Sequence, residues 1–121
     1  MPQIHSRPDS TWRLDAYAVS LDLARAVRPL FGPIGRFERD LSSQLKRAVA
    51  STALNIAEAQ RRTGNDRAHL LTVALGSADE SRAVLEVAAA LGAVDEADTV
   101  TAIALADRIC AMLYRLVQRI G

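Results

Sequence analysis

The feature that most constrains the fold is a row of polar side chains inside a segment of otherwise strong helical character. The row recurs at spacings of 3, 4, 4 and 3 residues and comprises Gln44, Arg47, Ser51, Asn55 and Glu58. At about 100° per residue, these positions fall within an arc of roughly 80° on one helix face. A solvated face rarely needs so regular a set, and a core face rarely tolerates one. The row therefore indicates either a polar layer between packed helices or a binding surface.

The composition favours helices within one domain. A length of 121 residues is typical of a single domain. Twenty-two alanines and fifteen leucines stand beside only five aromatic residues, and Ala and Leu are strong helix formers. We therefore predict an all-α fold.

Helix-breaking residues divide the chain into an arm and four helices. Residues 1–11 lack periodicity and predict a flexible N-terminal arm. The bundle then occupies residues 12–121, with helices expected at about 12–29, 37–61, 67–91 and 95–119. Pro29 ends the first helix, Phe31 to Gly35 form a turn, and Gly92 ends the third helix. Such short connections favour a single up-down-up-down antiparallel four-helix bundle.

Apolar residues at helical spacing predict the buried faces. The expected stripe of the first helix is Leu14, Tyr17, Leu21, Ala24 and Val27, and that of the second is Leu41, Leu45, Ala48, Thr52, Ile56 and Ala59. Further apolar residues fall outside the stripes, among them Val19, Leu23, Met112, Tyr114 and Leu116. A monomer would expose some of them to water, which favours self-association. The alternative is that isolated apolar residues are ordinary on surfaces.

Antiparallel pairing of the second and third helices supplies partners for the polar row. With Gln60 facing Arg67, Ser51 lies level with Gly76 and Arg47 with Glu80, to within about one turn. We predict an ion pair between Arg47 and Glu80, and we expect His69 near Glu58. The predicted structural polar layer comprises Gln44, Arg47, Ser51, Asn55, Glu58, Ser77 and Glu80.

The overall charge is close to neutral, but the two halves of the chain differ. The net charge is +1, which gives no global attraction to nucleic acid or to anionic membranes. Residues 1–62 carry a balance of +4 and residues 63–121 a balance of −3. The candidates for contact with RNA, DNA or another partner are therefore Arg36, Arg39, Lys46, Arg61 and Arg62. The alternative is a solvated helix face, with the last two favoured at a helix C-terminus.

The chain offers no group of residues suited to catalysis or to cofactor binding. His5 and His69 lie far apart, and no cluster of His, Cys and carboxylates has metal-ligand spacing. Cys110, the single cysteine, falls on an apolar helix face, where it packs as a small apolar residue. We therefore expect no enzyme activity, no catalytic residue, no metal and no cofactor.

The sequence also argues against export and against a membrane. No charged segment leads into an apolar one at the N-terminus. Charged residues interrupt every apolar stretch well before the roughly 20 residues that a transmembrane helix needs. We expect a cytoplasmic protein with no membrane partner.

Two linked motifs carry a resemblance to a known family. The first comprises Lys46, Arg47, Ala48 and Ser51 followed by the run Asn55-Ile56-Ala57-Glu58, and the second comprises Leu71, the run Ala74-Leu75-Gly76-Ser77 and Glu80. Over roughly residues 13–120, the chain resembles the four-helix-bundle proteins encoded in 23S rRNA intervening sequences. Relatives of that family include the accessory variability determinants of diversity-generating retroelements.

The resemblance implies a cytosolic four-helix bundle that assembles into a homopentamer and has no known catalytic residues. It also implies nucleic-acid contact through basic surfaces, which the retroelement relatives use. The chain departs from the family pattern at Ala59, where glycine is usual, and at Lys46, where arginine is usual. The chain also differs from the retroelement relatives in charge, because its net charge is only +1 and theirs is strongly basic.

The functional hypothesis from sequence is a non-enzymatic, homo-oligomeric accessory protein. Its partners would be further copies of itself and RNA, DNA or a nucleic-acid-processing protein. The alternative hypothesis is a protein–protein interaction scaffold that binds no nucleic acid.

Overall fold

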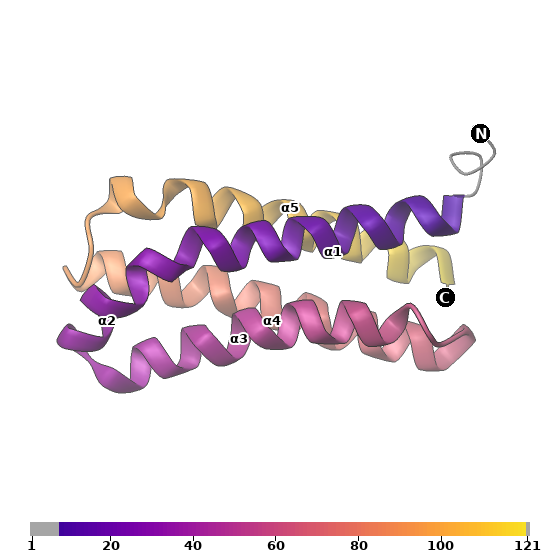
Figure 1. Cartoon of the computed structure of the whole chain (residues 1–121), viewed down its shortest axis with the longest axis horizontal. Coiled ribbons are helices and arrows are strands. Elements are labelled where there is room, and N and C mark those ends of the chain that lie inside the picture. The colour runs from indigo at the N-terminus through magenta and orange to yellow at the C-terminus, as the bar shows by residue number, and fades with distance from the viewer. Residues whose placement is uncertain (1–7, 121) are drawn as a thin grey trace.

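The chain folds into a bundle of four long helices, shown in Figure 1. A computed structural model describes residues 8–120, and the side chains of residues 15–120. The long helices are α1 (Pro8–Val27), α3 (Arg39–Ala59), α4 (Gly64–Ala90) and α5 (Glu96–Ile120), and the short helices η2 (Arg28–Leu30) and α2 (Phe31–Phe37) join α1 to α3. The described residues contain no strand. The predicted all-α four-helix bundle is confirmed.

The four long helices close into a ring of pairwise contacts. Helix α3 packs against α4, α4 against α5, and α1 against both α3 and α5. The side formed by α1 and α3 therefore lies opposite the side formed by α4 and α5. Helix α2 and the α4–α5 connection share one end of the bundle, which we call the α2 end (Figure 1). The α3–α4 loop lies at the other end, the loop end.

The connection between α1 and α3 is helical, which corrects the predicted turn at residues 31–35. Pro33 stands in the first turn of α2, where its missing amide breaks no helical hydrogen bond. Ile34 is fully buried, and Ser42 of α3 donates a hydrogen bond of 3.1 Å to the carbonyl of Phe31. These contacts hold α2 against α3, so the segment gains more by packing than by reversing at its glycines.

The helix ends differ from the predicted ones at both ends of α1. Helix α1 begins at Pro8, so the last four residues of the predicted arm are helical, because proline suits a first helical position. Residues 1–7 of that arm lie outside the described residues. Helix α1 ends at Val27, shortly before Pro29.

Two glycines with positive φ mark the two ends of α4. Gly64, at φ +55°, begins α4 three residues before the predicted start. Gly92, at φ +85°, follows α4 and confirms the predicted helix stop. The amides of Gly92 and Ala93 bond to the carbonyls of Ala89 and Ala88, at 3.1 and 2.9 Å. This pattern is a Schellman cap, which favours glycine at the left-handed position.

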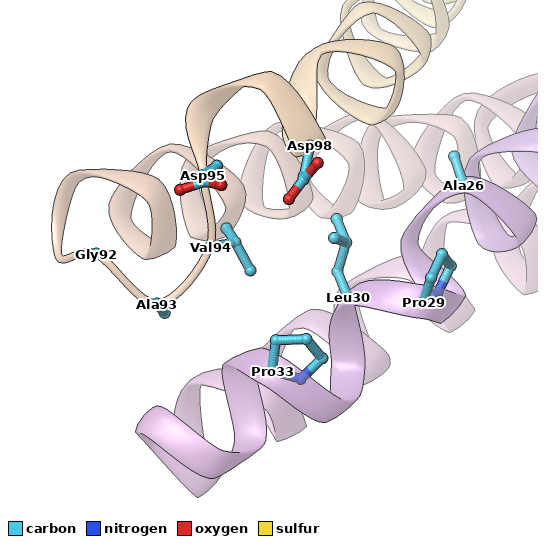
Figure 2. A pocket seen from close by; sticks show the side chains of 9 residues that line it. All are labelled: Ala26, Pro29, Leu30, Pro33, Gly92, Ala93, Val94, Asp95 and Asp98. Atoms are coloured by element: carbon cyan, nitrogen blue, oxygen red, sulfur yellow. The ribbon is translucent and has the colours of Figure 1, made fainter.

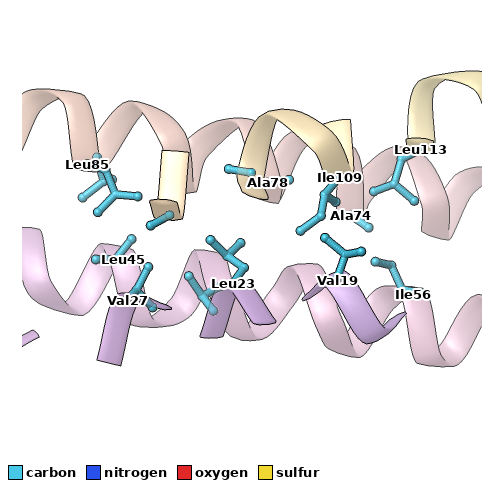
Figure 3. Close-up of a cluster of buried hydrophobic side chains, with 14 of the residues drawn as sticks. Val19, Leu23, Val27, Leu45, Ile56, Ala74, Ala78, Leu85, Ile109 and Leu113 are labelled. Atoms are coloured by element: carbon cyan, nitrogen blue, oxygen red, sulfur yellow. The ribbon is translucent and has the colours of Figure 1, made fainter. Parts of the chain in front are cut away.

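The core runs along the centre of the bundle (Figure 3). On α3 the predicted stripe is buried except for Leu41, which is half-buried. On α1 the predicted stripe is displaced: the buried residues are Ala16, Val19, Ser20, Leu23 and Val27, whereas Tyr17, Leu21 and Ala24 are half-buried. The side chain of Leu14 lies outside the described part. Two overlapping apolar stripes run along α1, and contact with α3 and α5 selects one of them.

This displacement overturns part of the sequence argument for self-association. Val19, Leu23 and Leu116, which we expected outside the buried stripes, are all buried, and Met112 is half-buried. Of that set, only Tyr114 is exposed. Self-association would therefore have to cover other apolar side chains.

Serine and threonine side chains are buried in the core with their hydroxyl groups hydrogen-bonded. The hydroxyl of Thr52 donates to the carbonyl of Ala48 at 2.8 Å, and that of Ser81 donates to the carbonyl of Ser77 at 2.9 Å. Such bonds to the preceding turn satisfy a buried hydroxyl within its own helix. They allow α3 and α4 to approach closely through small residues.

Candidate interaction surfaces

The polar row of α3 meets α4 through its central members. The hydroxyls of Ser51 and Ser77 form a hydrogen bond of 2.7 Å between the two helices. The amide nitrogen of Asn55 donates to the Ser51 hydroxyl at 3.1 Å and to the Ser51 carbonyl at 2.8 Å. All three side chains are half-buried. The Ser51–Ser77 bond agrees with the predicted register of the two helices to within one residue.

The outer members of the row face water. Gln44, Arg47 and Glu80 are exposed, and no ion pair joins Arg47 to Glu80 among the side chains that the structure describes. The predicted Arg47–Glu80 pair is therefore wrong. The observed register sets the buried Ser81 level with Arg47, while Glu80 points outward. Two hydrated charges at a surface gain little from pairing.

Glu58, the last member of the row, pairs within its own helix end. Its carboxylate accepts a hydrogen bond from the guanidinium of Arg62 across one helical turn. His69, which we expected near Glu58, is exposed. The pair is largely open to solvent, so its contribution to stability is small.

The five basic candidates do not form one patch. Arg36, Arg39 and Lys46 lie at the α2 end of the bundle, whereas Arg61 and Arg62 lie at the loop end. All five are exposed. At 1.5 Å per residue along α3, Arg61 lies about 33 Å from Arg39 and about 22 Å from Lys46. We call them the α2-end set and the loop-end set.

Lys46 is held against an aromatic ring in the α2-end set. Its ammonium group lies 5.3 Å from the centre of the Phe31 ring, a distance typical of a cation–π contact. Phe31 thus supports the position of Lys46 on the surface where α2 packs on α3.

The α4–α5 side carries an acidic surface that our sequence analysis missed. Residues 79–107 contain seven carboxylates and one basic residue, Arg82, a balance of −6. All seven carboxylates are exposed. Dividing the chain into halves gave only −3 for the second half, because Arg108, Arg115 and Arg119 follow in the same half. A shorter window along the sequence would have revealed the surface.

Arg82 joins the two helices at the centre of this acidic surface. Its guanidinium pairs with Asp79 on α4, and its Nε lies 3.4 Å from the carboxylate of Asp107 on α5. The hydrogen bond to Asp79, and then the charge of Asp79, raise the pKa of Arg82. Arg82 therefore stays charged at any ordinary pH, and its position leaves the other carboxylates of the surface uncompensated.

Cys110 lies beside this cluster and has the character of a packing residue. Burial raises the pKa of the Cys110 thiol, and Asp79 raises it further, while Arg82 opposes the change. A thiol with a raised pKa is protonated at neutral pH and is a poor nucleophile. The side chain is half-buried against the core, as predicted.

A cleft of about 470 Å³ opens at the α2 end (Figure 2). Leu30 and Pro33 line it from the α2 side, and Val94 lines it from the α4–α5 connection. Asp95 and Asp98 stand on its α5 side, where carboxylates stabilise the positive N-terminal end of a helix. Helix capping and packing account for these residues, so the cleft defines no ligand.

The described residues offer no metal centre and no membrane span. No group of three or more His, Cys, Asp and Glu side chains among them is arranged to hold a metal ion. None of the described helices is long and apolar enough to cross a membrane. The surfaces described above are therefore the features that carry a functional argument.

The fold and these surfaces define the class of protein: an all-α four-helix bundle that presents two separate basic sets and an acidic surface. The model of the 23S rRNA-intervening sequence protein family matches residues 13–115. The chain belongs to this family.

A solved structure has the same fold. It is the crystal structure of a protein of unknown function from the S23 ribosomal protein family of Bacteroides thetaiotaomicron, and its TM-score is 0.75. The two chains are 22% identical, and the likeness covers 84% of this chain and 97% of the other. At this identity the likeness supports the fold alone. No curated protein matches the sequence.

Proposed function

We propose that the chain is a non-enzymatic, cytoplasmic accessory protein that self-associates and contacts nucleic acid or a ribonucleoprotein. The observation that carries the proposal is the exposure of large apolar side chains on the outer faces of the bundle. Phe37, Leu54, Leu91, Val100 and Tyr114 are each more than half exposed, at 51 to 67%. A partner that covers large exposed apolar side chains removes their area from water, which favours association.

Self-association would cover these residues. They come from α2, α3, α5 and the residue that follows α4, so more than one face of the bundle needs a partner. A homo-oligomer offers each copy two contact surfaces, and a closed ring satisfies both in every copy. The family resemblance favours five copies, about 66 kDa for a chain of 13.1 kDa.

Light scattering coupled to size-exclusion chromatography tests this part of the proposal. We expect a mass several times that of the chain at micromolar concentration. A monomeric mass across that range would remove self-association from the proposed function.

Support for nucleic-acid contact comes from the exposed basic residues and from the family. The matching family is described as 23S rRNA-intervening sequence proteins. The resemblance to the accessory determinants of diversity-generating retroelements, which bind nucleic acid through basic surfaces, points the same way. The α2-end set and the loop-end set each offer guanidinium or ammonium groups for phosphates.

Charge reversal tests the two basic sets separately. One variant carries Arg39→Glu and Lys46→Glu, and another carries Arg61→Glu and Arg62→Glu. Arg108→Glu, on the exposed side of α5, is the matched control. We expect RNA binding that weakens as salt rises, and a loss of affinity in the variant whose set contacts phosphates.

The scaffold alternative has one specific observation in its favour. The acidic surface, with a balance of −6 over residues 79–107, repels nucleic acid and suits a basic protein. An absence of RNA or DNA binding at low salt, in a protein that still self-associates, would establish the scaffold.

A further inference from the structure

A shallow apolar groove with acidic flanks lies on α5. Its volume is about 560 Å³. We call it the α5 groove, and it is lined by Glu96, Ala97, Thr99, Val100, Ile103, Ala104 and Asp107. Val100 is 64% exposed, so the apolar floor of the groove faces water. Glu96 and Asp107 mark its two ends, about 16 Å apart at 1.5 Å per residue.

Helix α4 adds a third carboxylate beside the groove. The contact between Arg82 and Asp107 fixes which residues of the antiparallel helices α4 and α5 lie level. Four residues further along α4, Glu86 is level with Ile103 in the groove. Glu86 is exposed, and its charge acts on Arg82. An apolar floor framed by three carboxylates suits an apolar side chain flanked by cations.

The chain carries such a group at the end of α2. Phe37, the last residue of α2, is 51% exposed and stands between Arg36 and Arg39 in the sequence. Both arginines are exposed. Around them, residues 28–47 carry five basic and two acidic side chains, a balance of +3. Helix α2 packs on α3.

We propose that the α5 groove of one copy receives Phe37 of a second copy, with Arg36 and Arg39 facing the carboxylates of the groove. The inference rests on the proposed self-association and assigns the two surfaces that make it. Exposed aromatic rings that enter an apolar pocket are typical anchors of protein interfaces. The opposite charges of the carboxylates and guanidiniums fix the orientation of the two copies. They also disfavour arrangements that bring like charges together.

The contact joins two different patches, the groove on α5 and Phe37 at the end of α2. Successive copies can repeat such a contact head to tail, as a heterologous interface. Heterologous contacts form a closed ring when the rotation between copies closes. Each copy in such a ring covers one groove and contributes one Phe37.

The contact between copies would cover part of the basic surface that could otherwise bind nucleic acid. In the assembly, Arg36 and Arg39 are occupied by the neighbouring copy. The loop-end residues Arg61 and Arg62, about 30 Å away along α3, lie outside this contact, and Arg62 also pairs with Glu58. RNA binding should therefore depend on the loop-end set more than on the α2-end set.

Single substitutions on the two surfaces test the contact. Phe37→Asp and Val100→Asp each place a charge in the apolar contact. Both sites are exposed, so each variant should fold, which far-UV circular dichroism and thermal unfolding check. We expect the dissociation constant for self-association to rise roughly 30-fold or more, as for a central aromatic anchor. Val73→Asp, at an exposed apolar site on α4 outside both surfaces, is the matched control and should retain assembly.

Charge exchange gives the decisive test. Arg36→Glu with Arg39→Glu reverses one surface, and Glu86→Lys with Glu96→Lys reverses the other. Each double variant alone should sediment as a smaller species than the parent. The chain carrying all four substitutions should regain assembly, because the two reversed surfaces are again complementary. Reversal of Arg61 and Arg62 should leave assembly unchanged.

The outcomes separate this inference from the proposal on which it rests. A monomeric parent protein would overturn both. An oligomeric parent whose Phe37→Asp and Val100→Asp variants assemble normally would overturn only the assignment of these surfaces. If the chain with four substitutions folds but does not assemble, the assignment of these surfaces would likewise be overturned.

Discussion

Helix α4 is joined to its two neighbours by different kinds of polar contact. Toward α3, neutral groups meet in a half-buried layer, where Ser51 and Ser77 share a hydrogen bond of 2.7 Å. Toward α5, charged groups meet near the surface, where Arg82 links Asp79 to Asp107. The difference teaches that position decides the chemistry: small neutral groups can be buried once hydrogen-bonded, whereas charges are retained where water still reaches them.

The largest expected effect comes from filling the neutral layer. Ser77→Leu forces a large side chain between α3 and α4, and overpacking of this kind costs about 1–3 kcal/mol of unfolding free energy. Urea denaturation followed by circular dichroism measures the loss. Ala83→Leu, at an exposed position on α4, is the control. Equal losses in the two variants would contradict a packed layer at Ser77.

Removal of the hydroxyl contact should cost less. Ser77→Ala removes one partner, but Asn55 still donates to Ser51, so we expect a loss of about 0.5–1 kcal/mol. The double variant Ser51→Ala with Ser77→Ala should cost less than the sum of the two single variants. Strict additivity of the three unfolding free energies would mean that the two hydroxyls do not interact.

The ionic contact should respond to salt, unlike the neutral one. Arg82→Met keeps an apolar side chain and removes the charge. The free energy of unfolding of the parent should therefore exceed that of the variant by a small amount at low salt, and the difference should vanish near 1 M salt. The effect of Ser77→Ala should stay constant over the same range. Parallel urea titrations at several salt concentrations compare the two. A salt-independent loss for Arg82→Met would indicate packing rather than charge as its role.

The smallest effect concerns the thiol beside the ionic contact. Burial and then Asp79 raise the pKa of Cys110, and Arg82 lowers it. Asp79→Asn should therefore speed alkylation of the thiol at a given pH, and Arg82→Met should slow it. Because the unfolded thiol ionises at a lower pH, the folded state loses stability as the pH rises from the ordinary thiol pKa toward the raised one. Rates of alkylation against pH, with the urea-unfolded chain as reference, measure the pKa.

Much of the fold could be predicted because its signals are local. Gly92 ends α4 because a Schellman cap favours a left-handed glycine, a requirement that depends only on neighbouring residues. The buried stripe of α3 is unambiguous because polar residues flank it. The register of α3 on α4 followed from the short loop, and the Ser51–Ser77 bond lies within one residue of it.

The wrong predictions concern choices that the local sequence leaves open. Helix α1 carries two overlapping apolar stripes, so periodicity alone could not select Val19 and Leu23 for the core. Residues 31–35 contain two glycines and a proline, which suggested a turn, but Ile34 gains more by burial in a short helix. Arg47 and Glu80 lie near one another in register, but their charged groups point into water.

By itself, the sequence determined an all-α bundle, its main helix boundaries and the polar row that meets α4. Helical propensity, capping and spacing act over a few residues, so they can be read along the chain. Only the tertiary structure decided which side chains are buried, that the basic residues form two separate sets, and that an apolar groove on α5 lies among exposed carboxylates. Those properties depend on which helices become neighbours, because burial and surface charge arise from residues far apart in the chain.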